Sequence, residues 1–160
     1  MKPERKCVPM EELSPLIVGL INEGIDVTLT VTGNSMKPML TTHRDSVVLS
    51  KCDPLDLKAG DIPLYQRENG KYILHRIVKV NPDTYDMAGD HQKDIERGVN
   101  KSQILCVVKG FTRNGKYHTV EEPLYLAYVF VWCAMLPLRG FVMRTHGLLH
   151  KIFKGKQKRK

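Results

Sequence analysis

The sequence predicts a mainly β domain, of the compact folded-sheet or barrel type, over about residues 25–120. Short runs rich in β-branched residues follow one another there and are separated by turn residues, which is typical of small β domains. Two Asn-Gly pairs, at 69–70 and 114–115, lie between such runs and indicate tight hairpins. We expect a short helix before this region and an apolar, then basic, helical segment after it.

The N-terminal amphipathic helix is expected over residues 9–23. Apolar residues recur there at i, i+3 and i+4 spacing, which places them on one helical face. Gly24 follows the last of them, where a helix commonly ends. The apolar residues of this face are Met10, Leu13, Leu16, Ile17, Leu20 and Ile21.

Six runs of residues predict strands. In the first, valine and leucine alternate with Thr28, Thr30 and Thr32, which indicates a half-buried strand. The fourth run, taken as one continuous strand, places His75 on the same face as two isoleucines. Pro63 in the third run indicates a sheet edge or a bulge. The runs cover residues 26–33, 45–51, 61–66, 71–80, 84–89 and 102–120, the last with a turn at 114–115.

The C-terminal part differs in composition, and we divide the chain into a β-rich unit at 1–122 and an apolar, then basic, segment at 123–160. Residues 124–138 contain no charged side chain, but they are fewer than the ~20 apolar residues that a membrane-spanning helix needs. Three interpretations stay open: a helix in the membrane interface, a helix packed on the domain or a partner, and a marginal span.

The net charge of +8 is concentrated at the C-terminus. Residues 139–160 contain eight Lys or Arg and no acidic residue. A basic tail after an apolar stretch fits an anionic lipid surface. We therefore expect contact with a membrane surface, on a side that the sequence does not indicate, and a cytoplasmic location is compatible with it. Nucleic acid is not an expected partner, because the basic residues do not alternate with aromatic ones along the strands.

The cysteines indicate neither a metal site nor a disulfide framework. Cys7, Cys52, Cys106 and Cys133 lie on unrelated segments, and none is part of a C-x-x-C pair. We expect free thiols in a reducing compartment, with no metal and no cofactor. The N-terminus also lacks the apolar core of a cleavable signal peptide.

The motif "GNSMKPML" at 33–40 makes Ser35 a candidate nucleophile. Gly33 and Pro38 restrict the backbone on either side of the serine, as is expected where one hydroxyl must point in a definite direction. A serine hydroxyl is a weak nucleophile unless a base removes its proton. His75, on the apolar face of a predicted strand, is the candidate base, although buried histidines are often only structural.

Acid candidates come from two Gly-Asp pairs. Asp90 follows Gly89 directly and would project a short carboxylate from a turn, and Asp61 follows Gly60 in the same way. Either aspartate could simply stabilise its own turn. Taken alone, each of these patterns is weak.

The order of these motifs resembles the signal peptidase I superfamily of serine peptidases. "GNSMKPML" is similar to the Gly-x-Ser-Met-x-Pro-x-Leu box around the nucleophile, and "RDSVVLSK" to the next strand box, with Arg44 in place of the usual Gly. "LKAGDIPLY" and "MAGDHQKD" resemble the two later Gly-Asp boxes. The resemblance covers about residues 28–110, and it implies a signal-peptidase-type catalytic fold.

The residue before Arg76 indicates the subtype. Common bacterial signal peptidases and LexA-type repressors have a lysine base there, whereas His75 resembles the endoplasmic-reticulum and archaeal subgroup, which pairs Ser, His and Asp. The resemblance implies Ser35 as nucleophile, His75 as general base and Asp90 as the third member, with Asp94 in reserve.

The resemblance also implies a substrate and a way of binding it. The expected activity is endoproteolysis of leader or signal sequences after small residues, in a polypeptide precursor bound along the strand "DVTLTVT". Gly33, Met36 and Pro38 are the expected substrate-binding residues, and the Ser35 N–H is one expected donor to the oxyanion.

Two other functions stay open at this stage. A LexA-like self-cleaving regulator would need an upstream helix-turn-helix, for which the about 24 residues before the first strand are too few, and an internal scissile pair. No Cys-Gly is present, and the Ala-Gly pairs at 59–60 and 88–89 both follow Ser35, the second in the Asp90 turn. A non-catalytic domain of the same fold could bind peptides or membranes instead.

Overall fold

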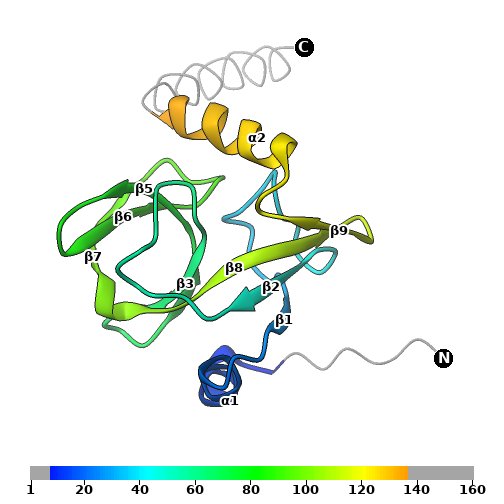
Figure 1. Cartoon of the computed structure of the whole chain (residues 1–160), viewed down its shortest axis with the longest axis vertical. Coiled ribbons are helices and arrows are strands. Elements are labelled where there is room, and N and C mark those ends of the chain that lie inside the picture. Colours follow the sequence, from blue (N-terminus) through cyan, green and yellow to red (C-terminus); the bar gives the residue numbers. More distant parts are fainter. Residues whose placement is uncertain (1–7, 137–160) are drawn as a thin grey trace, which may run out of the picture.

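The computed structural model describes residues 8–136 and is mainly β, with one helix at each end of the described region (Figure 1). The predictions for residues 137–160, including the basic tail, and for Cys7 concern residues outside this range. The elements are α1 (Met10–Asn22), β1 (Val27–Thr30), β2 (Ser46–Ser50), β3 (Pro63–Gln66), β4 (Tyr72–Leu74), β5 (Arg76–Val80), β6 (Thr84–Ala88), β7 (Glu96–Asn100), η1 (Lys101–Gln103), β8 (Ile104–Arg113), β9 (Lys116–Thr119) and α2 (Pro123–Ala134).

The strands form two antiparallel sheets. The larger sheet has the order β1-β2-β8-β3-β4, with β9 paired to β8, and it curls so that β1 and β4 are its two ends. The smaller sheet has the order β5-β6-β7. The long strand β8 pairs with β2, β3 and β9 along its length, which allows one strand to hold most of the larger sheet together.

Both predicted hairpins are confirmed. β3 and β4 pair around Asn69-Gly70, with Gln66 opposite Tyr72 and Gly70 at φ +81°. β8 and β9 pair around Asn114 and Gly115, both at positive φ. In the second hairpin, Asn114 and Gly115 thus meet the requirement of a type I′ turn, a positive φ at both central residues, whereas in the first hairpin Gly70 is at positive φ and Asn69 is not.

The N-terminal helix is also confirmed. Ile17 and Ile21 of α1 are buried against the larger sheet. Gly24, at φ +83°, ends the helix: its N–H donates to the Ile21 carbonyl, and the Ile25 N–H donates to the Leu20 carbonyl. These two bonds form a Schellman motif, which explains the glycine at this position.

The predicted continuous strand at 71–80 is wrong. Leu74 pairs with Leu64 in the larger sheet, whereas Arg76 pairs with Ala88 in the smaller one, so the chain changes sheets at His75. The expected alternation of faces is lost there, because His75, Arg76 and Ile77 are all buried between the two sheets.

Pro63 is not on an edge strand, since β3 lies between β8 and β4. It is the first residue of β3, ahead of the first β4 pair at Leu64. The expected irregularity is next to it, as a register shift between Leu64 and Tyr65 in the pairing with β8.

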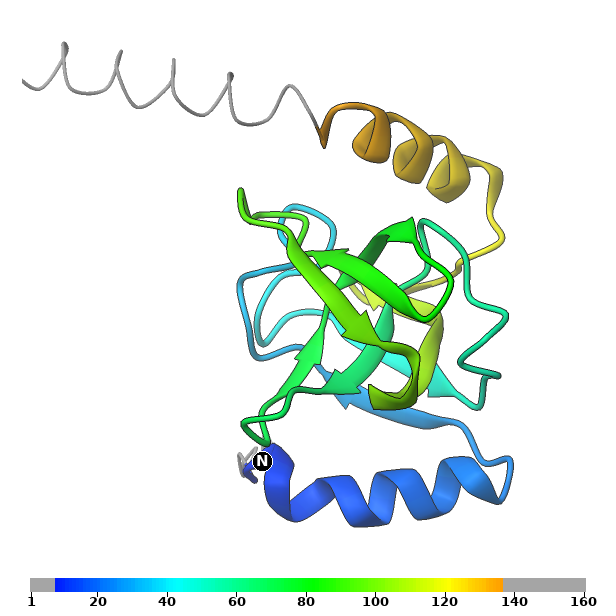
Figure 2. The same cartoon turned by 90° about the vertical axis from the view of Figure 1, so that its left-hand side faces the viewer.

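Two groups of apolar residues form the core. The larger one joins α1, the curled sheet and Tyr125 of α2. The smaller one lies under the second sheet and contains Tyr65, Ile77, Tyr85, Met87, Val99 and Ile104. The two helices cover opposite sides of the β domain (Figure 2).

The described C-terminal helix packs on the domain through few side chains. α2 begins at Pro123, and its Tyr125 is buried while Tyr128 and Val129 pack against the larger core. Within residues 8–136, no helix has both the length and the apolar character that a membrane span requires.

Candidate functional site

A cleft of ≈ 330 Å³ opens between β1 and β4, the two ends of the curled sheet. Its lining includes Ser35, His75, Gln92 and Arg67, together with apolar side chains of α1 and the sheet. Three sequence segments that are distant from one another therefore contribute polar groups to one cavity. The apolar lining residues include Met10, Leu29, Val31, Leu64 and Leu74.

Ser35 lies in the loop between β1 and β2, and buried neighbours anchor it. Met36, Met39 and Leu40 are each at most 2% exposed and belong to the larger core. The Thr42 hydroxyl donates to the Gly33 carbonyl at 2.6 Å, which closes the loop on its outer side. The peptide before Pro38 is cis. Ser35 itself is only half-buried, so the loop holds its hydroxyl at the cleft.

The Gly89 turn holds the Ser35 backbone directly. The His91 N–H donates to the Ser35 carbonyl at 2.7 Å. A Cβ on Gly89 would lie 2.7 Å from that carbonyl oxygen and 3.0 Å from Ser35 Cβ, which no real side chain tolerates. Gly89 is therefore needed for this close approach, and the sequence pattern had suggested only a turn.

His75 also lines the cleft, and it lies at the point where the chain changes sheets. It is 3% exposed, and burial lowers its pKa to about 4, with a further decrease from Arg67. The carboxylates of Glu96 and Asp90 act in the opposite direction. His75 is thus neutral at pH 7 and able to accept a proton.

Ser35 and His75 line the same cleft, but among the hydrogen bonds of residues 8–136 there is none between them. Catalytic hydrogen bonds are often long in the absence of substrate and shorten in the complex. The arrangement is compatible with a serine and a base acting on one bound group.

Asp90 is occupied by a different partner from the one predicted. Its carboxylate accepts from Arg76 Nε at 2.9 Å and from Nη2 at 2.7 Å, and the Tyr128 hydroxyl donates to it at 3.1 Å. Both side chains of the Arg76–Asp90 pair are 1% exposed. No hydrogen bond of the described residues joins Asp90 to His75, and Asp90 acts on the pKa of the histidine only through its charge, which raises it. The reserve candidate, Asp94, is exposed.

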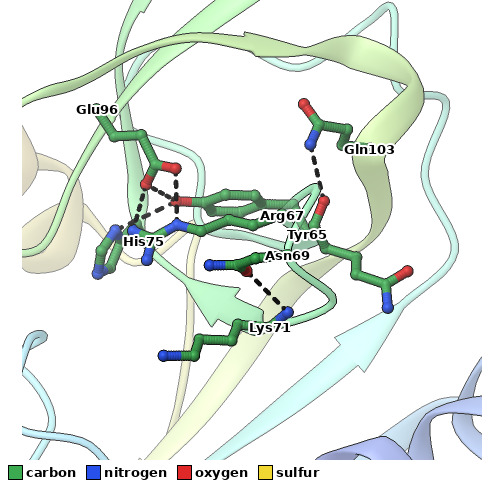
Figure 3. Close-up of polar contacts among 8 residues, drawn as sticks. Tyr65, Arg67, Asn69, Lys71, His75, Glu96 and Gln103 are labelled. Atoms are coloured by element: carbon green, nitrogen blue, oxygen red, sulfur yellow. Dashed lines mark hydrogen bonds and ion pairs between the residues drawn. The ribbon is translucent and has the colours of Figure 1, made fainter.

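A second polar network touches His75 instead (Figure 3). The Tyr65 hydroxyl lies 3.4 Å from His75 Nδ1 and donates to Glu96 Oε2 at 2.6 Å. Arg67 binds both oxygens of Glu96, at 2.7 and 2.5 Å. Sequence reasoning assigned no role to Tyr65 or Glu96. Glu96 is on β7, whose sequence "ERGVN" lacks an apolar alternation, so the sequence predicts no strand there.

The predicted substrate-binding residues are placed differently. Gly33 lines the cleft at an exposed position. Met36 also borders it, but its side chain is 2% exposed and packs in the core. Pro38 is exposed and is not part of the lining.

Thiol and metal chemistry find little support in the described part of the chain. Burial raises the pKa of Cys52 to about 11 and that of Cys106 to about 12, so neither is a thiolate at neutral pH. Residues 8–136 contain no group of three or more His, Cys, Asp or Glu side chains that could hold a metal ion.

Neither the models of known protein families nor the curated protein sequences match this chain.

Proposed function

We propose that this protein is a serine endopeptidase resembling signal peptidase I, with Ser35 as nucleophile and His75 as general base. The observation that carries the proposal is the shared cleft, in which a half-buried serine hydroxyl and a buried neutral histidine border the same cavity. A neutral imidazole is the form that can activate a serine.

In this mechanism, Ser35 Oγ attacks the scissile carbonyl while His75 accepts the hydroxyl proton. The imidazolium then returns that proton to the leaving amine, and an acyl-enzyme remains on Ser35. Water attacks the acyl-enzyme with the same base, which releases the second product and restores the serine. No cofactor or metal takes part.

The oxyanion needs preorganised donors, of which the Ser35 N–H is one. Gln92 is the candidate for the second, which the sequence motif leaves unassigned. Its side chain lines the cleft, and its Oε1 and Ser35 Cβ lie 3.1 and 3.0 Å from the position that a Cβ on Gly89 would take. The Gln92 amide group is therefore beside the serine, and its Nε2, not the Oε1 that this distance locates, would be the donor.

The substrate proposed is an extended polypeptide precursor. Within residues 8–136, β1 and β4 each have one neighbouring strand in the larger sheet, so each has an edge that no other described strand pairs with, and the cleft lies between these edges. An extended segment could pair with one edge by main-chain hydrogen bonds and place alternate side chains in the apolar lining. The preference for small residues before the scissile bond is taken from the resemblance.

Replacing Ser35 with alanine tests the proposal. We expect the full-length wild-type protein to cleave some members of a peptide panel with Ala-x-Ala-type sites, and Ser35→Ala to lose at least ~10³-fold in kcat/KM. Ser46→Ala is the matched control, because Ser46 is a half-buried serine on β2 that does not line the cleft. Cleavage that persists in Ser35→Ala would contradict the assignment of the nucleophile.

The same experiment separates the two other functions. A peptide-binding domain would bind panel members without cleaving them, and Ser35→Ala would bind as the wild type does. A self-cleaving regulator would show, by intact mass, a break in its own chain that Ser35→Ala prevents. The pair Ala88-Gly89 adjoins Ser35 and is the pair to examine first.

We also propose that α2 contacts an anionic membrane surface. Four large apolar side chains of α2, and that of Met135 at its C-cap, are more than 40% exposed, and the sequence that follows contains the cluster of basic residues. An apolar helix surface followed in sequence by cationic residues matches the interface of an anionic bilayer. The exposed side chains are Leu124, Leu126, Phe130, Val131 and Met135.

Vesicle binding tests this contact. We expect the protein to cosediment with vesicles containing phosphatidylserine, more weakly with pure phosphatidylcholine, and less at high salt. Phe130→Ser should weaken binding by roughly 5-fold, since it removes a large apolar contact. Leu55→Ser is the control, because Leu55 is 67% exposed but lies outside α2. Equal binding by both variants would contradict the contact.

A further inference from the structure

The polar network beside His75 brings together three parts of the fold. Tyr65 is on β3, Glu96 is on β7, and His75 lies between β4 and β5. Tyr65 is fully buried, and its hydroxyl oxygen bridges Glu96 Oε2 at 2.6 Å and His75 Nδ1 at 3.4 Å (Figure 3). The distance to the histidine is at the long end for a hydrogen bond, whereas the distance to the glutamate is short.

The number of protons in this network determines the direction of each bond. Burial raises the pKa of Tyr65, with a further increase from Glu96, so Tyr65 keeps its hydroxyl proton. Burial would raise the pKa of Glu96, but the hydrogen bonds from Arg67 and Tyr65 outweigh it and hold that pKa below its ordinary value. Glu96 is therefore an ionised acceptor, and the tyrosine proton points to it.

With its one proton used on Glu96, the Tyr65 oxygen can only accept from the imidazole. Neutral His75 then carries its ring proton on Nδ1, and Nε2 carries none. This is the tautomer that a general base needs if Nε2 is to take the serine proton.

We propose that Tyr65 and Glu96 are the positioning residues of His75, with Glu96 acting through the tyrosine hydroxyl to fix the tautomer and orientation of the base. This inference rests on the proposed peptidase function for its catalytic meaning. It transfers to Glu96 the role that the sequence motif gives to Asp90.

The occupation of Asp90 supports this division of roles. Its carboxylate oxygens accept hydrogen bonds from Arg76 and Tyr128. Consecutive residues thus use different carboxylates: His75 reaches Glu96 through Tyr65, and Arg76 binds Asp90. Arg67 holds Glu96 in place and also borders the cleft.

The tautomer can be measured without any substrate. In full-length protein labelled with ¹⁵N-histidine at pH 7, the His75 ring signals are assigned by their loss in His75→Gln. We expect an Nδ1–H imidazole in the wild type and a shift toward the Nε2–H form in Tyr65→Phe. Tyr85→Phe is the matched control, since Tyr85 is fully buried in the same core and its hydroxyl donates to the carbonyls of Pro54 and Leu57 and not to His75 or Glu96.

His118 provides an internal reference for the Nδ1–H form, because its Nδ1 lies 2.8 Å from the carboxylate oxygen Glu122 Oε2. A wild-type His75 in the Nε2–H form, or a Tyr65→Phe spectrum identical to that of Tyr85→Phe, would overturn the positioning role. Glu96→Gln should shift the tautomer in the same direction as Tyr65→Phe.

Kinetics distinguish positioning from general structural support. On a cleaved peptide, Tyr65→Phe and Glu96→Gln should lower kcat by about 10- to 100-fold with KM within about 2-fold, as expected for a base that is present but poorly oriented. Tyr85→Phe should leave both constants unchanged. An unchanged kcat in Tyr65→Phe would overturn the proposal. If the tautomer behaves as expected and the wild type cleaves nothing, the positioning contact stands and the peptidase assignment fails.

Discussion

Asp90→Asn should lower the free energy of unfolding by about 3–5 kcal/mol, because it breaks a buried ion pair and leaves a buried guanidinium without its carboxylate. Arg76 is fully buried, and after the change it would keep only neutral partners, the Gly60 carbonyl and the Tyr125 hydroxyl among them. Urea denaturation at pH 7, with the midpoint and slope both measured, gives the difference.

Asp94→Asn is the matched control for this substitution. Asp94 follows in the same loop but is exposed, so its replacement should change stability by less than about 0.5 kcal/mol. Equal stability of the two variants would show that the Arg76–Asp90 pair does not hold the fold. If Asp90→Asn abolished cleavage while stability stayed unchanged, Asp90 would belong to the catalytic group instead.

Acidification from pH 7 to pH 4 should cost roughly 3 kcal/mol of stability through His75 alone. The pKa of the buried histidine is about 4 in the folded protein, against an ordinary value of 6.5. Between these pH values the unfolded chain binds a proton that the folded protein excludes, so stability falls as the pH decreases. The loss begins near pH 6.5 and is complete near pH 4.

The measurement is a series of denaturation curves between pH 7.5 and 4, for the wild type and for His75→Gln. The variant should lose most of this slope, whereas His91→Gln, which removes an exposed histidine, should retain it. A slope that is the same in wild type and His75→Gln would contradict a buried neutral imidazole. The same pKa predicts that the acid limb of kcat/KM lies near pH 4 and not near 6.5.

Local patterns predicted the local elements well. The Asn-Gly pairs gave both hairpins, and the spacing of apolar residues gave α1 within one residue at each end. These features depend on backbone preferences and on one buried face, and both are present in a short stretch of sequence.

Features that depend on distant residues could not be predicted in this way. A period-2 pattern shows that residues 71–80 are extended, but it cannot show that the two halves pair with different strands. The choice of partner for Asp90 depends on the placement of Arg76, and the contact between Tyr65 and Glu96 joins residues 31 positions apart. The Ser35 and His75 pair was predicted through the family resemblance, and the cleft that they share does not depend on it.

The division of the core into two groups has a consequence for local unfolding. The Ser35 loop is anchored in the larger core by Met36, Met39 and Leu40, whereas Tyr65, next to His75, belongs to the smaller one. Proteins open in cooperative units that often coincide with such substructures. An opening of the three-stranded sheet would take Glu96, on β7, away from Tyr65, on β3, while the curled sheet remained folded. The contact between Tyr65 and Glu96 would then depend on both substructures being folded. Amide exchange in β5–β7 would measure the opening that breaks it.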